Sequence, residues 1–394
     1  MSRRSHSLAS VRAVASREGD RVTRLELFFD LAFVFAFTQL TRLMEHDHDA
    51  LGVLQSLVAL ALLWWSWTAF GWLSNLAHAD EGILRVAMIT GMTAMFVVGL
   101  VVLEAFDDAS GGLFAPMVFV AAYLTARITH AIVFVWLSEP GLRRRTVISI
   151  VLSVAPSGAL LIVGALVGAP WQIWCMLAAV AIEPIISYRS SVGVEWPVRS
   201  ITHFTERHGL IVILALGESI LGIGGGVAEE PISVEILVGA VTSMLICVGM
   251  WWAYFARLAD SAEHLLASLP ASSRARVATD GYSYLHFVLV CGVVLAALGL
   301  EVAMTHIADL DAYGPFGAAA LGGGVACYLA GTAFFARRLL GPWNVARLAV
   351  ATLLVLAVPV FALIPAMAAL LSVAIMLMVL FFAERVRGQA PRRQ

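Results

Sequence analysis

Almost the whole chain divides into apolar stretches that are long enough to cross a lipid bilayer as helices. A helix needs about 20 apolar residues to span the hydrocarbon core. Apolar residues form 60% of the chain and charged residues only 13%, a composition that excludes an ordinary soluble domain. The sequence therefore predicts an all-α polytopic membrane protein with about twelve spans. The expected spans are 25–43, 52–74, 83–103, 113–137, 146–168, 171–188, 205–224, 235–258, 281–304, 314–336, 343–364 and 366–384.

Positive and negative charges alternate between the segments that join the expected spans. The arginine-rich segments are 1–24, 143–145, 189–199, 274–276, 337–338 and 385–394. The acidic segments are 45–49, 104–108, 229–230 and 309–311. Because arginine-rich loops remain in the cytoplasm, this alternation predicts that both termini are cytoplasmic and that the number of spans is even.

Related segments recur in the same order in the two halves of the chain. The tryptophan-rich stretch WWSWTAFGWLSNLAHADEG in the second span is matched by GMWWAYFARLADSAEHLL in the eighth. Glu104 and Glu301 close the third and ninth spans in the same way. This order favours two parallel six-helix repeats, as in transporter superfamilies, over chance recurrence. The predicted organisation is a cytoplasmic tail (1–24), two membrane repeats (25–188 and 205–384), a cytoplasmic connector (189–204) and a second tail (385–394).

The first chemistry-bearing segment is ELFFDLAFVFAF, where Glu26 and Asp30 share one helix face. Residue counting places Arg127 of the fourth span at a depth similar to that of Asp30, and His130 lies one helical turn nearer the cytoplasm. An ionised carboxylate in hydrocarbon costs several kcal/mol unless it is paired, protonated or in contact with water. We therefore expect an intramembrane Asp30–Arg127 ion pair, whose role is either structural or functional.

The second segment is SITHFTERHGLIVILALGESILGIGGG. His203, Glu206 and Arg207 project from one side of a helix start, and Glu218 follows roughly 18 Å further along the helix. No cationic residue near Glu218 in the sequence neutralises it. The glycines of this segment predict a small-residue surface for close packing and a carboxyl-terminal half that could break; they are Gly209, Gly217, Gly222 and Gly224–Gly226.

Glu183 and His208 are two further ionisable residues within the expected spans. Glu183 in VAIEPIIS is another carboxylate within an apolar span. His208 lies beside Arg207, yet the spacing of His203, Glu206 and His208 does not match a single-helix metal pair. We therefore predict no metal site and no cofactor.

Three segments together carry a family resemblance: TRLELFFDLAFVFAFTQLTR, the tryptophan-rich stretch of the second span, and HFTERHGLIVILALGESILGIG. They resemble the low temperature requirement protein A family of bacterial membrane proteins, and the resemblance runs from about Thr23 to the last span. It implies a polytopic protein of the bacterial inner membrane. The family name records a growth phenotype in the cold and assigns no substrate.

The function that the sequence favours is secondary transport of an unknown small solute or ion, with protons as the candidate coupling ion. Buried carboxylates would form the path, and no nucleotide-binding segment indicates ATP drive. The expected path residues are Glu218, Asp30, Glu183 and Glu206. The expected ion pairs or proton relay comprise Glu26, Arg127, His130, His203, Arg207 and His208. The expected partners are the lipid bilayer and the solute, with no nucleic acid.

The sequence leaves two alternative functions open, a membrane-embedded enzyme and an ion channel. A membrane-embedded enzyme acting on a lipid-type substrate would gather its polar residues in one pocket at the cytoplasmic face, whereas a transporter needs them along a path across the bilayer. The enzyme's candidates are His203, Glu206, His208, His78 and Asp80. An ion channel is a variant of the transport class.

Overall fold

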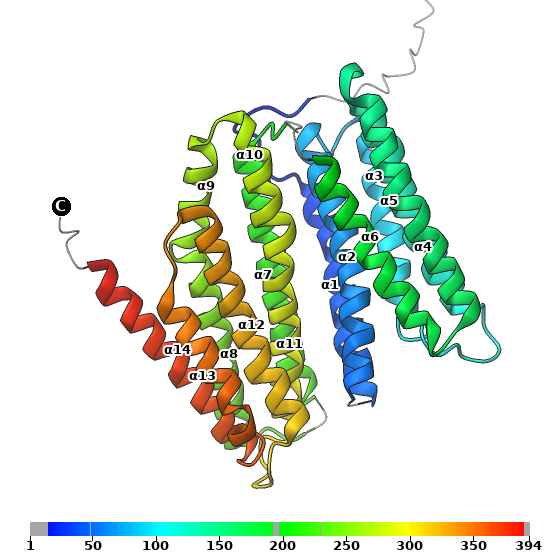
Figure 1. The fold of residues 1–394 in the computed structure, drawn as a ribbon. Helices are drawn as coiled ribbons and strands as arrows, with labels where there is room; N and C mark the ends of the chain where they lie inside the picture. The colour runs from blue at the N-terminus through cyan, green and yellow to red at the C-terminus, as the bar shows by residue number, and fades with distance from the viewer. Residues whose placement is uncertain (1–14, 48, 192–196, 229, 390–394) are drawn as a thin grey trace, which may run out of the picture. The chain divides into compact units, whose positions relative to one another are not determined.

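The structure is a computed structural model that describes residues 15–47, 49–191, 197–228 and 230–389. The chain is helical almost throughout this part (Figure 1). The α-helices are α1 (Arg24–Asp47), α2 (Ala50–Leu76), α3 (Gly82–Val101), α4 (Ala115–Leu137), α5 (Pro140–Val167), α6 (Trp171–Ser191), α7 (Ile201–Gly225), α8 (Val234–Phe255), α9 (Leu258–Ser268), α10 (Ala271–Ala278), α11 (His286–Thr305), α12 (Pro315–Leu340), α13 (Val345–Phe361) and α14 (Ala366–Gln389). A π-helix, η1 (Thr279–Leu285), joins α10 to α11.

Eleven helices in the described ranges are long and apolar enough to cross a membrane, and α13 adds a shorter apolar helix. A helix of 17 residues lies at the lower limit for a span. The all-α polytopic class is thus confirmed. Helices α9 and α10 and the π-helix were not expected, because the stretch after the eighth span is too polar to be predicted as a further span.

Prolines and glycines set several of the helix boundaries. Proline occupies the first turn of α5 and of α12, where its missing N–H is not needed. Helix α5 ends at Gly168 with φ +70°, a conformation that favours glycine. The break expected between the fifth and sixth spans therefore occurs where the sequence places Gly168 and Pro170.

The described residues form two compact units, which we describe separately. Unit 1 contains the chain up to Leu40 together with Val58–Arg207. In it α3 packs on α4, α4 on α5, and α5 on α6. Unit 2 contains Thr41–Leu57 and the chain from His208 onward. The parallel duplication predicted from the sequence remains a prediction.

Unit 2 is built around a close helix pair, α11 with α12. A Cβ atom added at Gly299 would lie 2.3 Å from the backbone nitrogen of Leu321. One added at Gly324 would lie 2.3 Å from that of Ala296. Glycine at these two positions lets the helix backbones touch, as small residues do in membrane helix pairs.

The glycine-rich end of the seventh span is not unwound in this structure, since α7 is continuous from Ile201 to Gly225. Gly222 and Gly225 instead lie against Glu301, whose carboxylate oxygens would be 3.4 and 3.2 Å from Cβ atoms added at these glycines. The glycines serve helix packing rather than a break. The tail residues 1–14 and 390–394, the connector residues 192–196 and the loop residue Glu229 lie outside the described residues.

Candidate functional site

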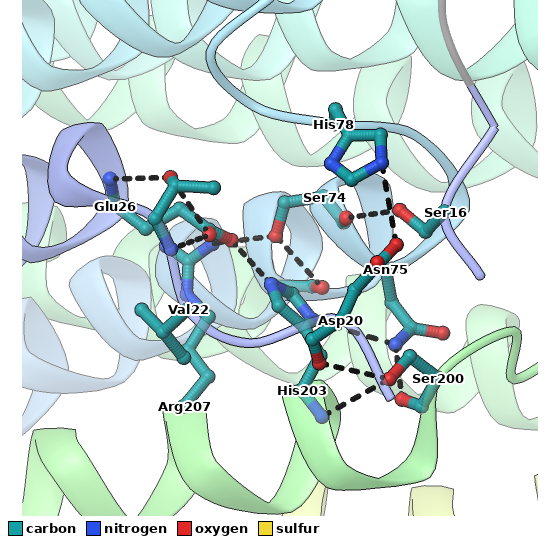
Figure 2. Close-up of polar contacts among 12 residues, drawn as sticks. Ser16, Asp20, Val22, Glu26, Ser74, Asn75, His78, Ser200, His203 and Arg207 are labelled. Carbon is teal, nitrogen blue, oxygen red and sulfur yellow. Dashed lines mark hydrogen bonds and ion pairs between the residues drawn. The ribbon is translucent and has the colours of Figure 1, made fainter. Parts of the chain in front are cut away.

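The centre of the site is Glu26, a fully buried carboxylate in the first turn of α1. Its Oε1 atom accepts from Arg207 Nη1 at 2.7 Å and lies 2.8 Å from His203 Nε2 (Figure 2). Its Oε2 atom accepts from the backbone N–H of Thr23 at 2.8 Å and from the Thr23 hydroxyl at 3.0 Å. Thr23 Oγ1 in turn accepts from the Glu26 N–H, which completes a capping box at the start of α1.

Arg207 connects Glu26 with a second carboxylate, that of Asp30. Its guanidinium is 1% exposed and donates through Nη1 to Ser74 as well as to Glu26. Nη2 lies 3.3 Å from Asp30 Oδ1. The guanidinium carbon also lies 5.6 Å from the centre of the Trp67 ring, a cation–π distance. One arginine therefore serves two carboxylates one helical turn apart.

Asp30 is fully buried, and its two oxygens differ in their contacts. Oδ1 accepts from Trp67 Nε1 at 2.7 Å and also faces Arg207. Oδ2 has no hydrogen-bond partner within the part of the chain that the structure describes. An unpaired oxygen on a buried, ionised carboxylate is costly, so this atom is the natural place for a proton.

The contacts of His203 assign its tautomer. Asn75 Nδ2 lies 3.4 Å from His203 Nδ1 and donates to the Ser200 carbonyl at 2.6 Å. Asn75 Oδ1 accepts from the Arg199 N–H at 2.8 Å, which fixes the orientation of the amide. Because Nδ1 faces a donor, it accepts, and Nε2 carries the hydrogen that points to Glu26. A histidine that accepts through Nδ1 and donates through Nε2 is the neutral tautomer.

The segment that precedes α1 is tethered to the ends of α2 and α7. Ser16 bonds to the carbonyls of Leu76 and Ser74 through its backbone N–H and its hydroxyl. Asp20 Oδ2 lies 3.3 Å from His78 Nε2 (Figure 2). The Val22 N–H donates to Glu206 Oε2 at 3.3 Å. Glu206 thus holds this segment in place beside the charge network.

A second charge centre in unit 1 joins α4 and α6. Arg127 Nη2 lies 2.6 Å from Glu183 Oε2, and both side chains are buried. The hydroxyl of Tyr123, also on α4, donates to Glu183 Oε1 at 3.3 Å. The expected Asp30–Arg127 pair is therefore wrong. Counting residues gives the depth of a side chain, but it does not give the direction in which its helix faces.

Two of the other candidates, Glu218 and His208, belong to unit 2. Glu218 is 2% exposed. His208 is buried and packs edge-on against Tyr282 and His286, with ring centres 5.1 and 5.4 Å away. His286 Nε2 lies 2.8 Å from the hydroxyl of Tyr254. Among the described side chains, no group of three or more His, Cys, Asp or Glu is placed to hold a metal ion.

Sequence reasoning missed Thr23, Trp67, Ser74 and Asn75 as members of the network. A signal for Thr23 was present, because Thr-Arg-Leu-Glu ahead of an apolar run is the pattern of a capping box. No local pattern indicates that Trp67, Ser74 and Asn75 of α2 face α1 and α7. Only the packing of the helices reveals them.

These features define a polytopic α-helical membrane protein with ionisable groups buried among its helices. The chain belongs to the family described as Bacterial low temperature requirement A protein (LtrA), whose pattern matches residues 21–382. The match includes both charge centres and confirms the resemblance seen in the sequence. An uncharacterized protein of Rhizobium meliloti (strain 1021) is 28% identical over 325 residues, which cover 79% of this chain and 76% of that protein. No solved structure matches the chain.

Proposed function

We propose that this LtrA-family protein is a secondary transporter of the bacterial inner membrane, which couples the movement of a small solute or ion to protons through Asp30. Both termini lie in the cytoplasm in this proposal, as the arginine distribution indicates. The observation that carries it is the charge balance of the network formed by Glu26, Asp30, His203 and Arg207.

The network contains more negative than positive charge when both carboxylates are ionised. Glu26 and Asp30 would contribute two negative charges, and Arg207 contributes one positive charge. His203 adds none, because its contacts assign the neutral tautomer. A net negative charge among fully buried side chains is strongly unfavourable, and a single proton removes it.

The contacts distinguish the two carboxylates as proton acceptors. Both oxygens of Glu26 are engaged, one by Thr23 and one by His203 and Arg207. Asp30 has one oxygen, Oδ2, that meets no donor among the described residues. A proton on Asp30 Oδ2 neutralises the network without displacing any hydrogen bond. Asp30 is therefore the group that binds and releases the coupled proton.

The direct test uses liposomes that contain the full-length protein and an internal pH dye. Added small solutes and ions, acetate among them, should drive proton movement in wild-type liposomes. Asp30→Asn should abolish this coupled movement while the folded yield stays near normal, because the variant mimics the protonated network. Traces from wild-type liposomes that match those from empty liposomes for every solute would refute the proposal.

Two further variants serve as comparisons for Asp30→Asn. Asp20→Asn makes the same chemical change at a partly exposed carboxylate that pairs with His78, and it should leave coupling unchanged. Glu26→Gln should lower stability, since it removes one ion-pair partner of the buried Arg207; breaking a buried pair costs about 3–5 kcal/mol. Unchanged coupling in Asp30→Asn would exclude Asp30 as the proton carrier.

A further inference from the structure

The second charge centre contains a buried guanidinium that is only partly satisfied. Arg127 is 5% exposed, and its Nη2 atom pairs with Glu183. Its Nε and Nη1 atoms have no hydrogen-bond partner in the ranges that the structure describes. Leaving a buried donor unpaired costs about 1–3 kcal/mol, and more when the group is charged.

A second unpaired polar atom lies on the same face of α4. His130 follows Arg127 by three residues and is 8% exposed. Its ring stacks on Phe134 at 5.3 Å and meets Phe70 edge-on at 5.8 Å. Its Nε2 atom has no hydrogen-bond partner among the described residues. Residues three apart on a helix are neighbours, so Arg127 and His130 present unpaired polar atoms to one region.

We propose that Arg127 is a binding site for a small monocarboxylate anion, which is bound through Nε and Nη1. A guanidinium has donors only, and carboxylates are among its preferred partners. Glu183 holds the guanidinium through Nη2, and Tyr123 holds Glu183 through its Oε1 atom, so both are positioning residues. His130 Nε2 forms a further hydrogen bond to ligands that carry a second polar atom, such as the hydroxyl of glycolate.

The net charge of the Arg127–Glu183 pair favours the binding of a monoanion over that of a dianion. Glu183 already compensates the positive charge of Arg127, so each bound anion adds uncompensated negative charge to a buried region. A monocarboxylate adds one charge, which one proton can balance. The inference deepens the proposed function by naming the class of solute, and it depends on that proposal only for the claim that the bound anion is transported.

Binding can be tested on the purified full-length protein in detergent without any transport assay. The thermal unfolding midpoint is measured against increasing acetate or glycolate, with sodium sulfate holding the ionic strength constant. Acetamide, which has the shape of acetate without its charge, is the control ligand. We expect acetate and glycolate to raise the midpoint and acetamide to leave it unchanged. Equal responses to acetate and acetamide would overturn the proposal.

Variants separate anion binding from a structural ion pair. Glu183→Gln removes the competing negative charge, so acetate should bind about tenfold more tightly to it than to the wild type. The double variant Arg127→Gln/Glu183→Gln keeps the region neutral and should fold but lose the response to acetate. If Glu183→Gln does not fold, the acetate responses of the wild type and the double variant still show whether Arg127 binds the anion. An acetate response that persists in the double variant would exclude Arg127.

His130→Phe tests the second contact, since a phenyl ring keeps the packing against Phe70 and Phe134. It should weaken the binding of glycolate several-fold and leave that of acetate unchanged. Equal effects on the two ligands would remove His130 from the site.

The outcomes of the binding and transport tests are distinguishable. Anion binding without coupled proton movement would refute the transporter and leave the site intact. Coupled proton movement without anion binding would refute the carboxylate class and leave the transporter intact.

Discussion

At the scale of single residues, Glu26 has a structural and an electrostatic role at once. Through Oε2 it caps the first turn of α1, and through Oε1 it holds Arg207 and His203. A carboxylate with this many donors stays ionised and fixed, so it is a poor proton carrier. Asp30, one turn further along α1, has fewer donors. The difference between these two neighbours is the basis of the proposed coupling.

Glu218 and Asp30 are competing candidates for the functional carboxylate, and matched amide substitutions distinguish them. The sequence places Glu218 first, because no cationic residue lies near it along the chain. The proposed function reverses that order and places Asp30 first. Glu218→Gln should therefore fold normally and retain at least about half of the wild-type proton coupling, since an amide still accepts hydrogen bonds at that position.

The measurement for Glu218→Gln is the same liposome assay, run beside Asp30→Asn with both variants at equal protein density. If Glu218→Gln lost coupling while Asp30→Asn kept it, the original ranking from the sequence would be restored. Loss in both variants would place a second essential carboxylate in unit 2.

At the scale of helices, the sequence predicts existence and length well and orientation poorly. Each apolar segment became a helix because its length matches the hydrocarbon core, and glycine or proline marks breaks such as that at Gly168. The partner of Arg127 was predicted wrongly, since Asp30 and Glu183 both satisfy the depth argument. Choosing between them requires the rotation of α1, α4 and α6 about their axes. Charge and hydropathy along one segment do not contain that information.

Close packing of α11 on α12 gives a prediction with an internal control. A Cβ at Gly324 would lie 2.3 Å from the Ala296 backbone nitrogen, and a backbone atom cannot rotate away as a side chain can. Gly324→Ala should therefore destabilise the protein by about 1–3 kcal/mol or more. At the neighbouring Gly323 no atom lies within 4 Å of an added Cβ. Gly323→Ala should be neutral, or stabilising by up to about 1 kcal/mol.

Unfolding midpoints of the two alanine variants in detergent, compared with the wild type, provide the measurement. Both changes add one methyl group to the same helix, so a difference between them reports the contact with α11 and not helix propensity. Equal midpoints for the two variants would contradict the backbone contact.

At the scale of the whole chain, the sequence identifies the class of protein and only part of the site. Glu26, Asp30, His203 and Arg207 were each singled out from the sequence, because ionisable residues in apolar runs are rare and conspicuous. Their assembly into one network was not foreseen, since α1 and α7 are separated by five helices. Long-range pairing of this kind follows from helix packing, which no local pattern encodes. The charge alternation of the loops, in contrast, concerns the chain as a whole.

That alternation yields a prediction about topology: twelve spans, with both termini in the cytoplasm. Residues 337–338 and 143–145 are arginine clusters and should be cytoplasmic, whereas the acidic segments around Asp107 and Asp309 should face the periplasm. Reporter enzymes active only on one side of the membrane, fused after Gln394, Asp107 or Asp309, measure this directly. A cytoplasmic reporter should be active after Gln394 and silent at the two acidic positions. The shortest of the apolar helices expected to span, α13, decides the parity: if it does not cross the bilayer, the fusion after Gln394 becomes periplasmic. A periplasmic carboxyl terminus would leave eleven spans and would remove the parallel arrangement of the two halves.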